Sequence, residues 1–356
     1  MSRIKVTLYS AQLFSVNLYL KKIAMQNVKT TLLGLTLSFF MTAEGFAQNL
    51  SPEQIAQATS NTLSEGFDLQ GHRGARGLAP ENTLAGFALA LELEVTTLEL
   101  DTGVTKDGVV VIHHDAYLNP AIARDTKGKW VEDKSLLINE MNYTELARFN
   151  IGKLKPGSRY AERFPDQKPE VFQAIPKLAD LFEMVEEAGN KTIRFNIETK
   201  INPTKASDTV SPEIFVTQLL AVIEEHGMAD RVSIQSFDWR TLQLVQKRSP
   251  SIPTVYLSAQ QKWLDNIASG QAGTSGWTAD FDVDDYQGSI PKLIKAAGGT
   301  VWSPFYRELT STLLAEAHKE GLKVIPWTVN DPNDIATLIG MGVDGIITDY
   351  PHPRLK

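Results

Sequence analysis

The chain has 356 residues, of which 42% are hydrophobic and 22% are charged, and its net charge is −7 at pH 7. This balance is typical of a globular protein with a sizeable core. The acidic charge argues against a general nucleic-acid binder, which usually carries a basic face. The absence of cysteine excludes disulfides, thiolate metal sites and cysteine nucleophiles.

The N-terminal segment 1–47 has the order of charged, apolar and small residues that is typical of a secretory signal peptide. Lys21, Lys22 and Lys29 precede an apolar run over 30–41, and Gly-Phe-Ala at 45–47 is a small-residue cleavage site. The run is short for a membrane span. We therefore expect a periplasmic or secreted mature chain, 48–356, with no stable membrane anchor after cleavage. An uncleaved N-terminal anchor is the alternative.

Short apolar runs alternate with amphipathic stretches along the mature chain, which predicts buried parallel strands connected by helices. The expected strands are 67–71, 97–101, 192–198, 232–236, 254–258, 300–304, 323–328 and 345–348. The expected helices are 83–93, 178–188, 211–226, 240–246, 308–320 and 332–341. Eight strands that alternate with helices predict an α/β fold, a (β/α)8 TIM barrel.

Two stretches exceed the minimal repeat. Residues 103–114 predict a hairpin, because Lys-Asp-Gly at 106–108 is a strong turn signal. The polar segment 116–176 carries one expected helix, 142–149, and predicts an insertion after the second strand. A second long connection, 259–298, follows the fifth strand. In a barrel such loops lie over the catalytic mouth and set substrate choice.

The insertion contains several candidate substrate contacts. Its candidate anion contacts are Arg124, Lys127 and Lys129, and its apolar or aromatic ones are Trp130, Phe149, Tyr160 and Phe164. We predict that the insertion governs substrate choice rather than chemistry. The alternative is a solvated loop that merely covers the barrel.

Carboxylates stand at the ends of the second and third expected strands. Glu99 and Asp101 are two residues apart, so both side chains leave the same face of the strand, and Glu198 ends the next strand. Polar residues at the carboxyl ends of barrel strands are typical of active sites. Three carboxylates make an oxygen-only site, which favours Ca²⁺ or Mg²⁺ over zinc.

Two histidines and two cations lie at the same strand ends. His72 and Arg73 follow the first strand, His114 closes the hairpin, and Lys200 follows the third strand. Histidine titrates near neutrality and can act as acid or base, and arginine is a planar cation that holds a phosphate. This inventory suits metal-assisted attack on a phosphodiester. Singly, each residue has a structural alternative, such as an ion pair between Glu198 and Lys200.

Six segments of the chain resemble the glycerophosphodiester phosphodiesterase family, in the family's order, over 71–351. They are HRGARGLAPENT, LELDTGVTKDGVVVIHHD, FNIETK, IQSFD, WTVN and GVDGIITDYP. The pairing of HRG and PENT with ExD and HD is specific to this family. The resemblance implies an enzyme that hydrolyses glycerophosphodiesters, such as deacylated phospholipid head groups, to glycerol 3-phosphate and an alcohol.

The resemblance also implies roles for the residues that match the family's motifs. The expected general acid and base are His72 and His114. The expected ligands of one divalent cation, Ca²⁺ or Mg²⁺, are Glu99, Asp101 and Glu198. The expected substrate contacts are Arg73 and Lys200 at the phosphate, with Gln235 and Trp327 lining the pocket.

The doublet at His113 and His114 requires an assignment. The family's histidine stands immediately before an aspartate, so His114 is the match, and His113 alternates to the other side of the strand. Asp115 is expected to orient a neighbour rather than to bind metal. Which histidine is the acid stays open, as does attack by water against attack by the glycerol hydroxyl through a cyclic phosphate.

Three alternatives compete with this prediction. A phospholipase D-like enzyme on the same barrel would act on lysophospholipid or sphingolipid and would need an acyl channel, which 116–176 and 259–298 could supply. A glycosidase barrel also uses paired carboxylates but does not need two histidines and an arginine together. A non-catalytic binding module would have no reason to retain the acid, base and metal positions. The sequence indicates neither the alcohol moiety nor the oligomeric state.

Overall fold

The computed structural model describes residues 66–352 of the chain. The expected signal peptide and its cleavage site lie outside the described residues, so export stays a prediction. Within 66–352, no helix combines the length and the apolar character needed to cross a membrane.

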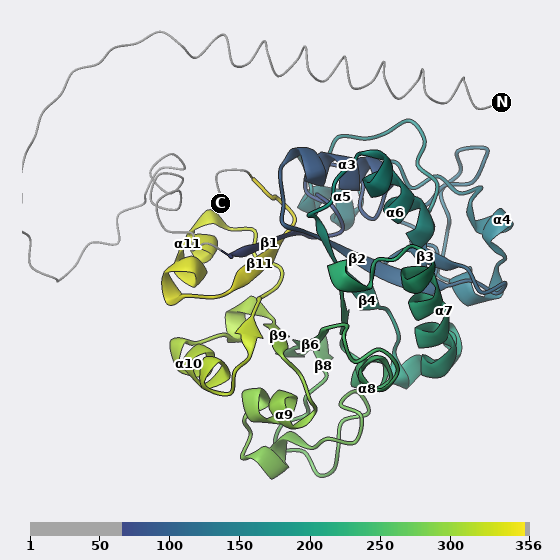
Figure 1. Cartoon of the computed structure of the whole chain (residues 1–356). Helices are drawn as coiled ribbons and strands as arrows, with labels where there is room; N and C mark the ends of the chain where they lie inside the picture. The colour runs from purple at the N-terminus through teal and green to yellow at the C-terminus, as the bar shows by residue number, and fades with distance from the viewer. Residues whose placement is uncertain (1–65, 353–356) are drawn as a thin grey trace, which may run out of the picture. The chain divides into compact units, whose positions relative to one another are not determined.

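Eight parallel strands in the described part of the chain form a barrel, which confirms the predicted (β/α)8 fold (Figure 1). Backbone bonds from Asp344 to Val324 and from Val329 to Ile347, 3.0 and 2.9 Å long, join the last two strands and close it. The barrel strands, in spatial order, are β10 (Lys323–Val324), β9 (Val301–Pro304), β6 (Thr254–Ser258), β5 (Val232–Ser236), β4 (Arg194–Thr199), β2 (Thr97–Val104), β1 (Asp68–Gly71) and β11 (Gly345–Thr348).

Helices surround the barrel strands on the outside (Figure 1). They are α3 (Leu84–Glu92), α6 (Leu178–Glu187), α7 (Pro212–Glu225), α8 (Trp239–Arg248), α9 (Ile290–Ala296), α10 (Ser311–Lys319) and α11 (Pro332–Met341). Side chains cap the first turns of several: the Thr83 hydroxyl accepts from the Gly86 amide before α3, and Ser211 caps α7, which has proline at its first position. Gly342 ends α11 in the left-handed conformation, with φ 91°.

Strand β2 shows how the barrel separates its core from its site. Side chains alternate along a strand, so the buried Leu98 and Leu100 join the hydrophobic core. Glu99 and Asp101 point to the other face and are also buried, with exposed fractions of 2% and 1%. The predicted i, i+2 relation therefore places both carboxylates inside the barrel.

The predicted hairpin and insertion are both present after β2. Strand β3 (Val110–Ile112) pairs antiparallel with β2, and the segment up to α6 folds around a small hydrophobic core of its own. The core residues are Val111, Leu118, Ile122, Ala123, Val131, Ile138, Leu146, Ile151 and Ile175. The expected helix 142–149 is shorter, α4 (Tyr143–Leu146). A second helix, α5 (Arg159–Arg163), was not predicted, because its sequence RYAER has no apolar periodicity.

The second long connection, 259–298, also contains strands and a helix that the sequence did not predict. It contains the two-residue strands β7 (Gln260–Gln261) and β8 (Leu264–Asp265), and it ends in α9, the helix between β6 and β9. The expected strand 323–328 ends early at Val324 because Pro326 has no N–H to donate. The chain nevertheless stays beside β9.

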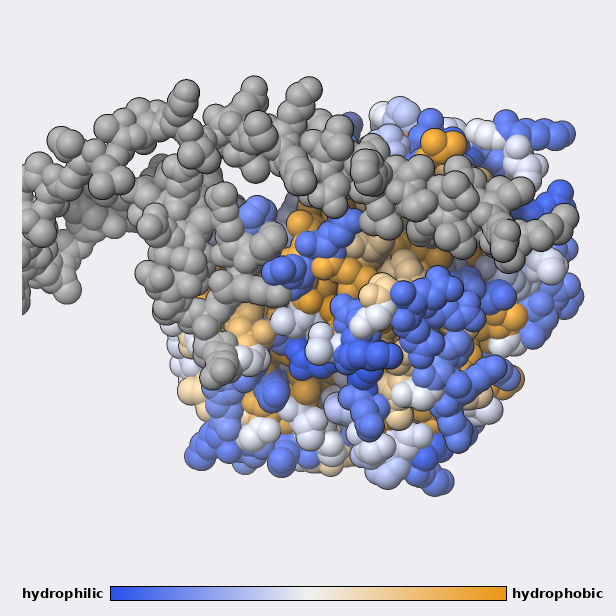
Figure 2. All heavy atoms as spheres, turned by 45° about the horizontal axis from the view of Figure 1, so that its top comes forward, coloured by the Kyte–Doolittle hydropathy of each residue, from blue (hydrophilic) through white to orange (hydrophobic). Residues whose placement is uncertain are grey.

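Large apolar side chains are scattered over the surface of the described residues. Figure 2 shows hydrophilic residues over most of one face, with apolar atoms visible between them. The exposed large apolar residues are Leu136, Val171, Phe172, Ile214 and Trp263. Scattered residues of this kind are ordinary for a globular domain.

We expect Phe182→Ala to lower the free energy of unfolding by about 3–5 kcal/mol, the usual cost of emptying a buried aromatic site. Phe182, on α6, is fully buried, and its ring centroid lies 5.0 Å from that of Phe195 on β4. Urea unfolding followed by circular dichroism measures the change. Phe172→Ala is the matched control: this ring is 53% exposed, and its loss should change stability by less than about 0.5 kcal/mol. Equal effects of the two substitutions would contradict the packing described here.

Candidate active site

A cavity of about 590 Å³ opens at the carboxyl ends of the barrel strands. Active sites of (β/α)8 barrels are built at this end of the strands. Of the nine residues predicted for the site, eight line the cavity: His72, Arg73, Glu99, His114, Glu198, Lys200, Gln235 and Trp327. The ninth, Asp101, lies beneath them in contact with Arg73 and Lys200. The structure thus brings all nine together, while their roles stay predictions.

The three predicted metal ligands form one cluster. Strands β2 and β4 are neighbours, and their register places Asp101 beside Glu198. Glu99, Asp101 and Glu198 each offer an oxygen, and these oxygens lie within 4.8 Å of one another. This is the donor set that a hard divalent cation such as Ca²⁺ or Mg²⁺ prefers, and all three residues are buried. The residues present therefore fit a metal ion.

The charges of the cluster are poorly balanced by protein groups alone. Burial, together with Asp101, raises the pKa of Glu99 well above its usual range. Burial also raises the pKa of Glu198 to about 7, despite its ion pair with Lys200. Burial alone would raise the pKa of Asp101 too, but Arg73 and other cations hold it well below its usual range. A bound cation would allow all three carboxylates to be ionised.

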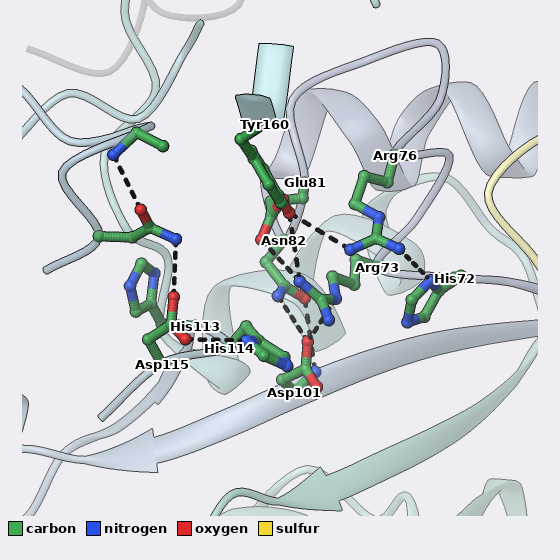
Figure 3. Close-up of polar contacts among 12 residues, drawn as sticks. His72, Arg73, Arg76, Glu81, Asn82, Asp101, His113, His114, Asp115 and Tyr160 are labelled. Carbon is green, nitrogen blue, oxygen red and sulfur yellow. Dashed lines mark hydrogen bonds and ion pairs between the residues drawn. The ribbon is translucent and has the colours of Figure 1, made fainter. Parts of the chain in front are cut away.

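The two predicted phosphate-binding cations flank the carboxylates. The Nε atom of Arg73 lies 3.1 Å from Oδ2 of Asp101, and its Nη1 donates to Oε1 of Glu81 at 2.9 Å (Figure 3). The Lys200 Nζ lies 2.9 Å from Oε1 of Glu198 and 3.8 Å from Oδ1 of Asp101. The ion pair between Glu198 and Lys200 therefore exists, and both of its members also face the cavity.

His72 is held by Asp349, which comes from the other end of the chain, and Arg76 binds the same carboxylate. Its Nδ1 lies 2.7 Å from Oδ1 of Asp349, which follows β11, and the Arg76 guanidinium binds the same carboxylate with bonds of 2.7 and 3.0 Å. Burial and Arg76 lower the pKa of His72 to about 4, although Asp349 raises it. With Nδ1 engaged, Nε2 is the nitrogen left for chemistry, 3.9 Å from Oε2 of Glu99.

The structure separates the two histidines of the doublet. His114 lines the cavity, and its Nδ1 lies 3.1 Å from Oδ1 of Asp115, as expected for an orienting aspartate (Figure 3). Burial lowers the pKa of His114, and the positive charge of Arg73 lowers it further. His113 is buried away from the cavity lining, with Nε2 3.1 Å from the Tyr117 carbonyl oxygen. The geometry agrees with the match of His114 to the family's histidine.

Gln235 and Trp327 both line the cavity, as predicted, and they make different kinds of contact. The amide of Gln235 donates to Oε1 of Glu99 at 2.6 Å, so it also orients a metal-ligand candidate. Trp327 is the centre of an aromatic wall in the same cavity, with ring centroids 5.3 to 6.0 Å away. The other members of this wall are Phe237, Trp263 and Phe305.

Several residues that complete the site were not predicted. The charged ones are Arg76, Glu81 and Asp349, and the polar ones are Asn82 and Asn330. Their signal was present, since they lie inside the segments HRGARG, PENT, WTVN and TDYP. Their contact partners could not be predicted from the sequence. Arg76, for example, binds the carboxylate of Asp349, which is 273 positions away.

The predicted contacts in the insertion need correction. Arg124, Lys127 and Lys129 do not line the cavity: Arg124 stacks on Trp130, and Lys129 pairs with Glu132. The cation that the insertion does place there is Arg163, on the unpredicted helix α5. Tyr160, from the same helix, lines the cavity as predicted, whereas Trp130, Phe149 and Phe164 do not. Of the insertion 116–176, Asn119 and the two α5 residues Tyr160 and Arg163 line the cavity.

The sequence of the chain is similar to those of known phosphodiesterases. Residues 72–352 match the model of the glycerophosphoryl diester phosphodiesterase family. A glycerophosphodiester phosphodiesterase of Caldanaerobacter subterraneus is 30% identical over 287 residues, which cover 80% of this chain and 95% of that protein. One from Bacillus subtilis is 28% identical over 317 residues, which cover 88% and 94%.

Solved structures with this fold include a Silicibacter pomeroyi protein provisionally assigned as a glycerophosphoryl diester phosphodiesterase. It superposes with a TM-score of 0.71 and 33% identity over 84% of this chain and 95% of that one. An Oleispira antarctica phosphodiesterase in complex with the product sn-glycerol-3-phosphate has a TM-score of 0.57 over 83% and 96%, and at 23% identity it supports the fold alone. The family match extends over most of the barrel and includes every candidate site residue, and the chain belongs to the glycerophosphoryl diester phosphodiesterase family.

Proposed function

We propose that this enzyme hydrolyses glycerophosphodiesters to glycerol 3-phosphate and an alcohol, with one bound Ca²⁺ or Mg²⁺ and two histidines for proton transfer. The observation that carries the proposal is the convergence in one cavity of three buried carboxylates, two histidines and two cations. The family match supports the same reaction.

Glu99, Asp101 and Glu198 would hold the divalent cation, which when bound supplies positive charge for the phosphoryl oxygens. Arg73 and Lys200 stand on either side of these carboxylates and would bind the phosphate's remaining oxygens. Positive groups that are fixed in a buried cavity stabilise negative charge in the transition state without having to reorganise.

The contacts of the two histidines support a role in proton transfer. His72 keeps its Nδ1 on Asp349 and has Nε2 free toward Glu99, and His114 keeps its Nδ1 on Asp115. Because Nδ1 of His72 faces the Asp349 carboxylate, Nε2 would be the atom of the neutral ring that accepts a proton. One histidine would take the proton of the nucleophile, and the other would protonate the leaving alkoxide. The aromatic wall would contact the alcohol moiety.

Removal of divalent metal should abolish turnover of glycerophosphodiesters, and added Ca²⁺ or Mg²⁺ should restore it. The reason is that three carboxylates within 4.8 Å repel one another unless a cation joins them. The measurement is activity on glycerophosphocholine, other glycerophosphodiesters and lysophosphatidylcholine, before chelation, after it and after add-back. Full turnover by protein that metal analysis shows to be metal-free would contradict metal dependence. Turnover of the lysophospholipid alone would contradict the proposed substrate.

Replacement of His114 by Ala should lower kcat by about 10²–10⁴-fold, the usual effect of losing a general acid or base. His113→Ala is the matched control. It should leave kcat within about threefold while costing about 1–3 kcal/mol of stability, because it leaves the Tyr117 carbonyl without its partner. Steady-state kinetics and thermal unfolding of both variants test the assignment. An inactive His113→Ala beside an active His114→Ala would reverse it.

We also propose that the protein is exported and that its mature form begins near Gln48. The charged, apolar and small-residue order of 1–47 supports this proposal. N-terminal sequencing of protein from the extracytoplasmic fraction is the test, and a chain shortened by the signal peptide is the expected result. An intact N-terminus on cytosolic protein would refute export.

A further inference from the structure

We propose that Tyr160 is a positioning residue for the reaction: it holds the Glu81 carboxylate, and through it the Arg73 guanidinium, in the orientation that binds phosphate. Tyr160 comes from α5 in the insertion, so the insertion would support the chemistry as well as cover it. The inference rests on the proposed function, because it uses Arg73 as a phosphate ligand.

The hydroxyl of Tyr160 lies where one carboxylate and two guanidinium groups meet (Figure 3). It donates to Oε2 of Glu81, and it lies 3.5 Å from Nη1 of Arg73 and 3.3 Å from Nη1 of Arg76. The other oxygen of Glu81, Oε1, accepts from Nη1 of Arg73 at 2.9 Å. Each oxygen of Glu81 thus has its own partner, and loss of the hydroxyl would leave Oε2 poorly bonded.

The burial of this cluster makes each partner important. Glu81 and Arg73 are only 3% and 7% exposed. Buried charged groups are tolerated when their hydrogen bonds are satisfied, and an incomplete network is costly. A Glu81 carboxylate that loses one partner can rotate, and the Arg73 guanidinium that it holds would move with it.

The backbone of Arg73 is already fixed, so its side chain is the part that needs support. Arg73 has φ 52°, in the left-handed region that non-glycine residues seldom adopt. Its amide donates to Oε2 of Glu99 at 2.9 Å, and its carbonyl accepts from the Asn82 amide at 3.0 Å. The remaining freedom lies in the long side chain, whose end is held by Glu81 and Asp101.

The contacts of α5 allow the hydroxyl to be removed without undocking the helix. The ring of Tyr160 meets that of Phe164 edge-on, with centroids 5.3 Å apart. Further along, Gln167 donates its side-chain amide to the Arg76 carbonyl at 2.7 Å, and the Lys168 amide donates to the Leu78 carbonyl at 2.8 Å. These bonds join the insertion to the loop after β1 and do not involve the hydroxyl.

The test is Tyr160→Phe, with Tyr143→Phe as the matched control. Tyr160→Phe should lower kcat/KM by about tenfold, the size expected for one hydrogen bond to a charged group, and should weaken the binding of inorganic phosphate by a similar factor. Tyr143→Phe removes a hydroxyl from the same insertion, but this one donates to the Ile175 carbonyl at 3.3 Å, away from the cavity lining. It should leave both quantities within about twofold of wild type.

A second measurement separates positioning from a general structural effect. Glu81→Gln should itself lower kcat/KM, and Tyr160→Phe should then add less than about twofold, because the hydroxyl acts through Glu81. Wild-type kcat/KM in Tyr160→Phe would overturn the proposal. So would a loss of kcat/KM with unchanged phosphate affinity, or full additivity with Glu81→Gln. Calorimetric titration of the metal-loaded protein with phosphate needs no turnover, so it tests Tyr160 even if the proposed substrate is wrong.

Discussion

The crowding of negative charge inside the barrel is the constraint on which the site depends. Glu99, Asp101 and Glu198 are buried together because β2 and β4 are neighbours in register. Such a cluster is unstable unless cations or hydrogen-bond donors face each oxygen. Arg73 and Lys200 supply permanent positive charge beside the carboxylates. Two cations do not balance three ionised carboxylates, so further positive charge, such as a divalent cation, is expected at the cluster.

Neutral amides supply the remaining donors to the cluster. The Asn82 side chain donates to Oδ2 of Asp101 at 2.9 Å, and Gln235 donates to Oε1 of Glu99. Gln235 is held in turn by Asn196 at 3.0 Å, which also donates to Gln70, deeper in the barrel, at 2.9 Å. A neutral donor orients a carboxylate without cancelling its charge. The amides therefore set the position of the ligand oxygens, while the charge needed to attract a metal is retained.

The predictions from sequence succeeded where the information was local and failed where it was not. The i, i+2 spacing of Glu99 and Asp101 was enough to place both inside the barrel, because side-chain alternation is a property of any strand. The bond between Arg76 and Asp349 could not be predicted, since it depends on the closure of the barrel between β1 and β11. Helix α5 was missed because it has five residues and no buried face, so it depends on its cap at Ser158 and on tertiary contacts.

The insertion and the barrel are more closely connected than their separate cores suggest. The carboxylates stand on barrel strands, which regular backbone hydrogen bonds hold in place. Arg73, in contrast, is a long side chain on the loop after β1. Tyr160 reaches that cation from the insertion through Glu81, and the neighbouring Arg163 faces the same cavity. A change in the insertion that moves α5 would therefore alter the cavity lining at Arg163 and the hold on Arg73 together. On the proposed function, substrate choice and phosphate binding would be coupled through α5, and this coupling would limit how freely the insertion can vary.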